Sequence, residues 1–354
     1  MNNFKTSMPN IIGIVGCISS NTIHNLYDLN ELFDYKPENV IKATGFVSKS
    51  IVDKNVSAID MSIIAAKHLI YKKNIDLNSI GALVNVSFTQ EFIMPGDATK
   101  AQIELGLHNN IMAFDLDMAC SGYIYGFYLA SVLANLHNKN VLLLNGDTQS
   151  KFTSRRDKST LPVMADAGTA TLIGPSFGTS KNEAIFSFYS NGSKQTSLYI
   201  PHGRSKHPFE ETSLQFKEIN PGSFSRPIDI FMDGFEIYKF VATEVSSFIS
   251  EFLSVNHIDK DEIQRLAFHQ ANIYMIKQLT KKINIPLNKL IITGDEYGNT
   301  SSSSVPLAIA TYYKNNSLQN RSENLLLSGF GAGLSIGVGY INITNNSYFN
   351  IIKY

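Results

Sequence analysis

A cysteine stands at the junction of two predicted elements in the segment DMACSG, residues 117–122. The run 111–119 has the apolar pattern of a strand and 121–137 that of a long helix, so Cys120 lies at a helix N-terminus. Free N–H groups and the helix dipole there can lower the pKa of a thiol from about 8.5 toward neutrality. Cys120 is therefore a candidate nucleophile, although a small buried filler remains an alternative. Cys17, inside the first predicted strand, is expected to be a core residue.

Two further polar residues follow apolar runs or turns in the second half of the chain. His269 ends the predicted strand of LAFHQANIYMI, and Asn299 lies in the polar turn of EYGNTSSSSVPLAIA. Each has a structural explanation when taken alone, a hydrogen-bonded histidine or an unusual helix start. The glycine-rich segment SGFGAGLSIGVGY, residues 328–340, allows backbone N–H groups to face a substrate. Together these residues supply a nucleophile and hydrogen-bond donors.

The composition is that of a soluble globular protein and excludes several functional classes. Of 354 residues, 44% are hydrophobic, and 30 Lys plus Arg balance 30 Asp plus Glu, so nucleic acid is not an expected partner. Two cysteines form no disulfide framework and have no metal-ligand spacing, so no metal is expected. No other cofactor is expected either. No window reaches the roughly 18 apolar residues of a membrane span. A cytoplasmic protein without membrane contact is predicted.

Segments with strand and helix patterns alternate along the chain, as in an α/β protein. Helical periodicity is predicted for 55–74, 97–107 and 121–137. Strands are predicted over the first apolar run and over the following segments: 79–88, 111–119, 140–147 and 168–175.

Two segments of the first half are echoed in the second. NIDLNSIGALVNVS (74–87) resembles HIDKDEIQRLAFHQ (257–270), and ADAGTATLIG (165–174) resembles GFGAGLSIGVG (329–339). Two similarities in the same order indicate a duplicated α/β core. We expect an N-terminal half, 1–180, and a C-terminal half, 181–354, that form one unit because no low-complexity linker separates them.

Taken together, the motifs resemble the β-ketoacyl-ACP synthase III family of the thiolase superfamily. AFDLDMACSGYIYGF is similar to the nucleophile segment of that family, HQAN and YGNTSSSSVP to its histidine and asparagine motifs, and GFGAGLS to its closing glycine loop. MADAGTATLIG and FMDGFEIYKFV are also similar, so that the resemblance spans almost the whole chain. It implies a five-layer αβαβα thiolase fold and a homodimer.

The resemblance also implies a mechanism and a role for each motif. Cys120 would accept an acyl group from an acyl-CoA or acyl-ACP, with the backbone N–H groups of Cys120 and Ala332 as the oxyanion hole. His269 and Asn299 would hold the thioester carbonyl of malonyl-ACP during decarboxylation and carbon–carbon bond formation. An asparagine suits this step because it donates a hydrogen bond to developing negative charge, which an aspartate would repel. The product would be a 3-oxoacyl thioester.

Several positions depart from the pattern of the family. Members that load from acyl-CoA clamp the adenine with a Trp and two Arg, whereas this chain has no Trp and has Asn39, Ala43 and Lys158 there. An acyl-ACP donor is therefore plausible. The arginine of the family's carrier-protein patch is replaced by Tyr274.

Other positions are assigned from the resemblance alone. Lys239, Lys281 and Lys282 could contact a carrier protein or simply be solvated surface. Met94, before Pro95, would enter the acyl pocket of the partner subunit.

Three alternatives stay open. A close relative would pass the acyl group from Cys120 to an oxygen or nitrogen nucleophile. Another would condense without decarboxylation and use a glutamate base, for which Glu91 is the candidate. In a different class, the chain would be a non-catalytic subunit that shapes the pocket of a heterodimer.

Overall fold

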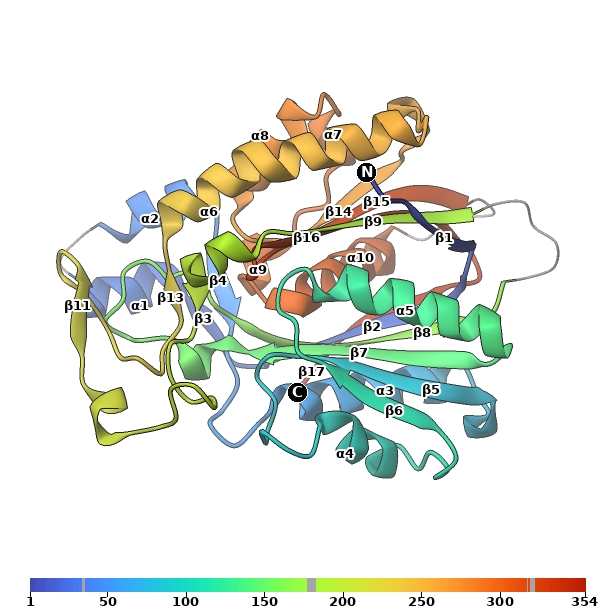
Figure 1. Ribbon diagram of the computed structural model, residues 1–354, viewed down its shortest axis with the longest axis horizontal. Coiled ribbons are helices and arrows are strands. Elements are labelled where there is room, and N and C mark those ends of the chain that lie inside the picture. Colours follow the sequence, from blue (N-terminus) through green and yellow to red (C-terminus); the bar gives the residue numbers. More distant parts are fainter. Residues whose placement is uncertain (34–35, 177–182, 317, 319–321) are drawn as a thin grey trace.

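The computed structural model describes residues 1–33, 36–176, 183–316, 318 and 322–354. Helices and sheets alternate in five layers (Figure 1): outer helices, a sheet, central helices, a second sheet and further outer helices. This arrangement confirms the predicted thiolase-like αβαβα fold, in which the two halves share the central helix layer.

The first sheet contains the strand that leads toward the candidate nucleophile. Its strands, in spatial order, are β17 (Tyr348–Lys353), β2 (Asn10–Ile18), β8 (Asp166–Gly174), β7 (Asn140–Thr148), β5 (Ile80–Val86) and β6 (Met112–Leu116). β8 is antiparallel to both neighbours, whereas β7, β5 and β6 run parallel. Parallel strands buried on both faces read as continuous apolar runs, which explains the sequence of β5 and β7.

The second sheet repeats this pattern. Its order is β1 (Phe4–Ser7), β9 (Glu183–Ser190), β16 (Ser335–Thr344), β15 (Ser322–Gly331) and β14 (Arg265–Phe268). The run β9–β16–β15–β14 has the same antiparallel, antiparallel and parallel pairings as β2–β8–β7–β5. The first sequence echo falls on the equivalent strands β5 and β14, and the second leads to β8 and β16. The predicted duplication is therefore confirmed at the level of topology.

The strand near each chain terminus pairs with the sheet of the other half. β1, near the N-terminus, pairs with β9 of the second sheet, and β17, near the C-terminus, pairs with β2 of the first. The expected boundary at 180/181 lies outside the described residues. The exchange of terminal strands joins the two halves through backbone hydrogen bonds as well as through the shared helix layer.

The central layer consists of α5 (Gly122–His137) and α10 (Ser304–Asn315), which lie between the sheets. α5 is apolar on most of its surface because it faces a sheet on each side. Small residues allow close approach to the first sheet: a Cβ on Gly126 would lie 2.8 Å from Leu143 Cδ1, and one on Gly122 would lie 2.5 Å from Val86 Cγ1. This contact fixes the start of α5, and with it the position of Cys120.

The outer layers hold α3 (Ala58–Lys72) and α4 (Asp97–Glu104) on one side, and α6 (Gly234–Phe240), α7 (Ser246–Val255) and α8 (Ile273–Lys282) on the other. α3 begins where Ser57 and Asp60 form a capping box, a few residues inside the predicted range. The remaining short elements are β3 (Thr22–His24), α1 (Asn25–Leu32), α2 (Pro37–Thr44), β4 (Ser48–Ser50), β10 (Leu198–Tyr199), β11 (Lys217–Asn220), β12 (Ser223–Ser225), β13 (Phe231–Met232) and α9 (Gly294–Tyr297).

Candidate active site

A cavity of about 760 Å³ lies where the two halves meet, and its lining includes Cys120, His269, Asn299 and Ala332. These residues come from four separate segments of the chain. Most of the remaining lining is apolar, and the half-exposed Thr44, Lys158 and Asn272 also line the cavity. The fold thus brings the predicted nucleophile and donors to one space large enough for an acyl thioester.

Cys120 lies directly before the first turn of α5 and is buried, with 6% of its surface exposed. Its sulfur lies 3.9 Å from the Ser301 hydroxyl oxygen. Burial raises the pKa of the thiol to about 12 and outweighs the lowering effect of the hydrogen bond from Ser301. The expectation that the helix terminus brings this pKa toward neutrality is wrong, because desolvation disfavours the thiolate more than the local dipoles favour it.

His269 follows β14 and is held on two sides. Its backbone N–H donates to the Ser328 carbonyl at 2.8 Å, and its Nδ1 lies 2.6 Å from the Ser304 hydroxyl oxygen. The edge of the ring meets Phe330 at 5.6 Å between centroids. Burial lowers the pKa of the imidazole to about 3, so the ring is neutral at physiological pH. The Ser304 hydroxyl engages Nδ1, and the ring also has a hydrogen bond to the Ser301 backbone. Nε2 donates to a ligand in the tautomer in which it carries the ring proton.

Asn299 lies on a loop between α9 and α10 that pairs with residues 163–165 like a short parallel strand. Its backbone N–H donates to the Val163 carbonyl at 2.9 Å, and its carbonyl accepts from the Ala165 N–H at 3.0 Å. The Asn299 Oδ1 accepts from the Ser301 N–H at 2.9 Å, so the donor Nδ2 is the end left for a ligand. Gly298 precedes it at φ +79°, where a Cβ would lie 2.7 Å from Ala165 Cβ.

The glycine turn after β15 closes over the cysteine. A Cβ on Gly331 would lie 2.8 Å from Cys120 Cβ and 3.1 Å from its sulfur, so only glycine leaves the thiol its present position. Ala332 follows on the cavity wall, with its carbonyl accepting from the Ser335 hydroxyl at 2.8 Å. The backbone of this turn therefore passes beside the nucleophile, as the predicted oxyanion hole requires.

Sequence reasoning missed a buried carboxylate beside the site. Asp147, in β7, accepts from the Ser302 hydroxyl at 2.9 Å and from the Phe88 N–H at 3.0 Å, and Ser301 also bonds to it. Burial raises the pKa of Asp147 to about 6 despite these donors. The signal in the sequence that could have indicated this site was an aspartate at the end of an otherwise apolar strand. The serines after Asn299, which were expected only to start a helix, are the hydrogen-bond partners of Asp147.

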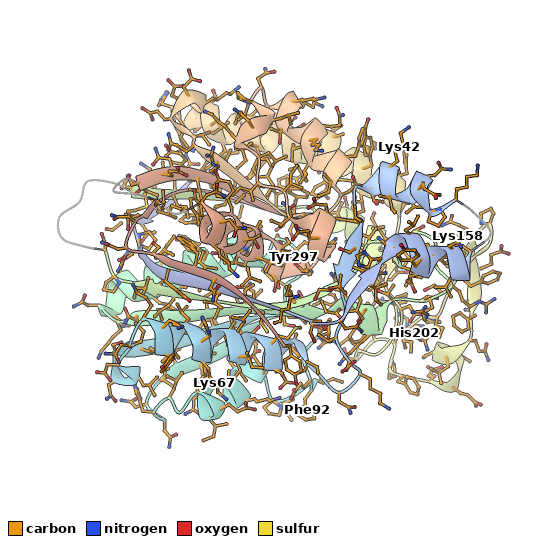
Figure 2. All side chains as sticks on the ribbon, turned by 180° about the vertical axis from the view of Figure 1, so that it is seen from behind. Lys42, Lys67, Phe92, Lys158, His202 and Tyr297 are labelled. Carbon is orange, nitrogen blue, oxygen red and sulfur yellow. The ribbon has the colours of Figure 1, made fainter. Side chains whose placement is uncertain are left out.

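The residues expected around the site are distributed over different surfaces. Lys158 lines the cavity, whereas Asn39 and Ala43 are exposed and lie outside its lining. Thr44, the neighbour of Ala43, does line the cavity. Met94 is 84% exposed and lies on the loop before α4. Figure 2 shows Phe92 of this loop at the lower edge of the molecule, far from Lys158.

Glu91 does not line the cavity. Its Oε1 accepts from the Ser57 hydroxyl at 2.7 Å and from Lys100 Nζ at 2.5 Å. The suggestion that it serves as a base for the cysteine of its own chain is therefore not supported by its position.

The candidate carrier-protein residues lie on the outer helices α6 and α8. Lys281 and Lys282 line a second groove of about 440 Å³ together with Tyr238 and Met275, and Met275 also lines the active-site cavity. Lys239 lies outside the groove lining, and its Nζ is 3.8 Å from Glu236.

The described part of the chain contains no cluster of three or more His, Cys, Asp or Glu able to hold a metal ion. Among the same residues, none of the helices has both the length and the apolar character needed to cross a membrane.

The models for 3-oxoacyl-[acyl-carrier-protein (ACP)] synthase III and for its C-terminal part match residues 114–192 and 253–343. A β-ketoacyl-ACP synthase III of Blochmanniella floridana is 30% identical over 312 residues, covering 87% of this chain and 92% of that protein. The chain belongs to the 3-oxoacyl-ACP synthase III family. This places it in the thiolase superfamily and confirms the resemblance seen in its motifs.

Further family members agree over the whole length. The Clostridium botulinum strain 657 β-ketoacyl-ACP synthase III is 29% identical over 328 residues, covering 92% of this chain and 96% of that protein. The crystal structure of the 3-oxoacyl-ACP synthase of Burkholderia xenovorans LB400 has a TM-score of 0.92 at 31% identity, covering 100% of this chain and 99% of that one. Membership of this family makes the chain a condensing enzyme of the acyltransferase class, and the other functions considered are not favoured.

Proposed function

We propose that the chain transfers an acyl group to Cys120 and condenses it with a malonyl thioester, with loss of CO2, to give a 3-oxoacyl thioester. The observation that carries this proposal is that Cys120, His269, Asn299 and Ala332 line one largely apolar cavity. A thiol, two neutral side-chain donors and a backbone turn are the groups that acyl transfer and enolate formation need.

In the first half-reaction, the Cys120 sulfur attacks the carbonyl carbon of the acyl thioester. The oxyanion of the tetrahedral intermediate accepts hydrogen bonds from the N–H groups of Cys120 and Ala332. When the intermediate collapses, the bond from carbon to the donor sulfur breaks, and the proton lost by the Cys120 thiol ends on the departing thiol. Because burial raises the pKa of the Cys120 thiol, deprotonation and attack are expected to be coupled.

In the second half-reaction, the thioester carbonyl oxygen of the malonyl group binds His269 Nε2 and Asn299 Nδ2. Cleavage of the bond to the carboxylate releases CO2, and its electron pair forms an enolate whose oxygen these two donors stabilise. The enolate carbon attacks the acyl carbonyl on Cys120, and collapse expels the Cys120 thiolate. Neutral donors suit this role, and burial keeps the pKa of His269 low enough for the ring to remain uncharged.

The proposal extends to the partners of the reaction. We infer malonyl-ACP as the extender and an acyl-ACP or acyl-CoA as the donor. Lys158 lines the cavity near the position where the resemblance places an arginine of the adenine clamp, and this replacement favours an acyl-ACP donor. The resemblance implies a basic docking patch for the carrier protein, and Lys281 and Lys282 beside the groove on α8 provide positive charge there.

A homodimer is also part of the proposal. β6 forms the edge of the first sheet, and the nearby loop exposes Phe92, Ile93 and Met94 by 60%, 77% and 84%. Consecutive apolar side chains at such exposure favour a protein interface. Through this interface Met94 would reach the acyl pocket of the partner subunit.

The test is intact-protein mass spectrometry after incubation with matched acyl-CoA and acyl-ACP donors. We expect a mass gain equal to the acyl group that is absent in Cys120→Ala and retained in Cys17→Ala, whose cysteine lies in the core of the first sheet. Subsequent malonyl-ACP should release CO2 and remove the acyl group from Cys120, and His269→Ala and Asn299→Ala should load but not release CO2. Absence of any adduct with every donor would contradict the proposal.

A further inference from the structure

Gln149 is a buried polar residue in the wall of the cavity for which the reaction above has no use. It directly follows β7 and is 3% exposed. The cavity lining also includes apolar side chains such as Met164, Leu198 and Ile230. A carboxamide in such a wall needs hydrogen-bond partners, because an unpaired buried polar atom costs free energy.

One end of this carboxamide is already committed to the protein. Gln149 Nε2 donates to the Asn299 carbonyl at 2.6 Å and to the Ala165 carbonyl at 3.3 Å. Both N–H groups therefore point at the backbone of the short parallel pairing that carries Asn299. These two carbonyls can only accept, so they fix which end of the carboxamide faces them.

The opposite end, Oε1, has no donor among the residues that the structure describes. Some described polar atoms are both inaccessible to solvent and unpaired: Asn25 Oδ1, Asp28 Oδ2, Asn145 Nδ2, Asn145 Oδ1, Thr300 Oγ1 and Ser328 Oγ. Gln149 Oε1 is not one of them, so this unpaired oxygen is accessible to solvent. An oxygen that is accessible on a buried residue of the cavity lining is accessible from the cavity. Gln149 thus offers a pre-oriented hydrogen-bond acceptor to whatever occupies it.

We propose that Gln149 Oε1 accepts a hydrogen bond from a hydroxyl group on the acyl chain, so that the enzyme selects hydroxylated acyl donors. The inference rests on the proposed function, since it names the class of acyl group that Cys120 carries. A hydroxyl fits better than an ammonium group, because a cation would lose its hydration in a largely apolar cavity. The malonyl carboxylate has only acceptors and does not compete for this oxygen.

Selection rests on the free energy that is lost when Gln149 Oε1 is left without a hydrogen bond. A donor without the hydroxyl displaces water from Oε1 and leaves it unpaired, whereas the hydroxylated donor replaces that water. Sites built to bond a hydroxyl discriminate strongly against the analogue that lacks it. We expect a preference of about tenfold or more, which corresponds to about 1.4 kcal/mol.

The experiment compares pairs of acyl-ACP donors of equal chain length, with and without a hydroxyl at carbon 2, 3 or 4. The rate of mass gain at Cys120 is measured for the wild type, for Gln149→Met and for the control Ile230→Leu. Methionine keeps the length of the side chain and removes the acceptor, while Ile230→Leu alters the lining without changing polarity. The quantity of interest is the rate ratio of each hydroxylated donor to its partner.

At least one pair should show a wild-type ratio of about ten or more, falling to near one in Gln149→Met and persisting in Ile230→Leu. A merely structural effect of Gln149→Met on the cavity wall would slow loading of both donors of a pair equally and leave the ratio unchanged, which would overturn the inference. A wild-type ratio near one for every pair would overturn it without the need for any variant. In both cases loading of the unsubstituted donors would leave the proposed function intact, whereas no loading at all would contradict both.

Discussion

The hydroxyl oxygen of Ser301 lies 3.9 Å from the sulfur of Cys120. The same hydroxyl bonds to the carboxylate of Asp147, so a single serine separates the thiol from a buried acid. Ser301 has a φ of +52°, and its N–H donates to Asn299 Oδ1. One residue thus contacts the nucleophile, the buried acid and the asparagine, and its hydroxyl is held in place by its backbone.

Replacement of Ser301 or Asp147 should move the reactivity of the thiol in opposite directions. Burial is the main reason for the raised pKa of Cys120, but the Ser301 hydrogen bond lowers it and the Asp147 charge raises it further. We expect Ser301→Ala to slow alkylation by iodoacetamide and Asp147→Asn to accelerate it by about tenfold at a given pH. The pH profile of adduct formation, followed by intact mass in a Cys17→Ala background, measures both.

Thermal unfolding of each variant provides the control for that experiment, since Asp147 has several backbone and hydroxyl donors. Rates that change in the same direction in both folded variants would contradict the assigned electrostatic roles.

The buried neutral state of His269 predicts a stability that falls in acid. The pKa of this ring is about 3 in the folded protein and 6.5 as the reference value, so the unfolded chain binds the extra proton between these values. The contribution is fully present above pH 6.5 and is lost as pH falls toward 3. From pH 7 to pH 5 the wild type should lose about 2 kcal/mol more unfolding free energy than His269→Gln. Urea unfolding at the two pH values measures this, and equal losses would argue against a neutral buried ring.

Gly331 should be intolerant of even a methyl group. A Cβ there would lie 2.8 Å from Cys120 Cβ, so Gly331→Ala must displace the thiol or the turn that carries Ala332. We expect acylation of Cys120 to fall by about 100-fold, as misplacement of reacting groups by about 1 Å commonly causes. The matched control is Gly192→Ala, also in the cavity lining, where a Cβ would meet nothing within 4 Å. Near wild-type acylation in Gly331→Ala would show that the turn has room to move.

Charge reversal on α8 should weaken use of a carrier protein without altering the chemistry. We expect Lys281→Glu combined with Lys282→Glu to raise KM for malonyl-ACP at least fivefold, while turnover of malonyl-pantetheine is unchanged. The dependence of KM on salt concentration should be no steeper than in the wild type. Lys67→Glu on α3 is the control, because that helix belongs to the opposite outer layer and its lysine is exposed (Figure 2). If both variants raise KM equally, a general charge effect explains the result and the groove on α8 is not the docking surface.

The sequence alone supplied the α/β class, the strand-to-helix position of Cys120 and, through its motifs, His269, Asn299 and Ala332. Local patterns sufficed there because these signals depend on residues that are close together in the sequence. They are the helix and strand periodicity, the turn glycines and the motifs around each site residue. The helix at 58–72 and the strand at 80–86 lie within the predicted ranges for the same reason. The echoed segments also anticipated the shared strand pairings of the two sheets.

Only the tertiary structure decided the chemistry of these groups. The helix terminus at Cys120 predicts an acidic thiol, but burial by segments far along the chain reverses the direction of the pKa shift. The contact with Ser301 and the acid at Asp147 join residues 120, 147 and 301, which no local pattern relates. Likewise, Gln149 exposes its oxygen because the carbonyls of Asn299 and Ala165 hold its nitrogen. Desolvation and hydrogen-bond direction depend on which distant atoms surround a group, and the fold alone fixes those.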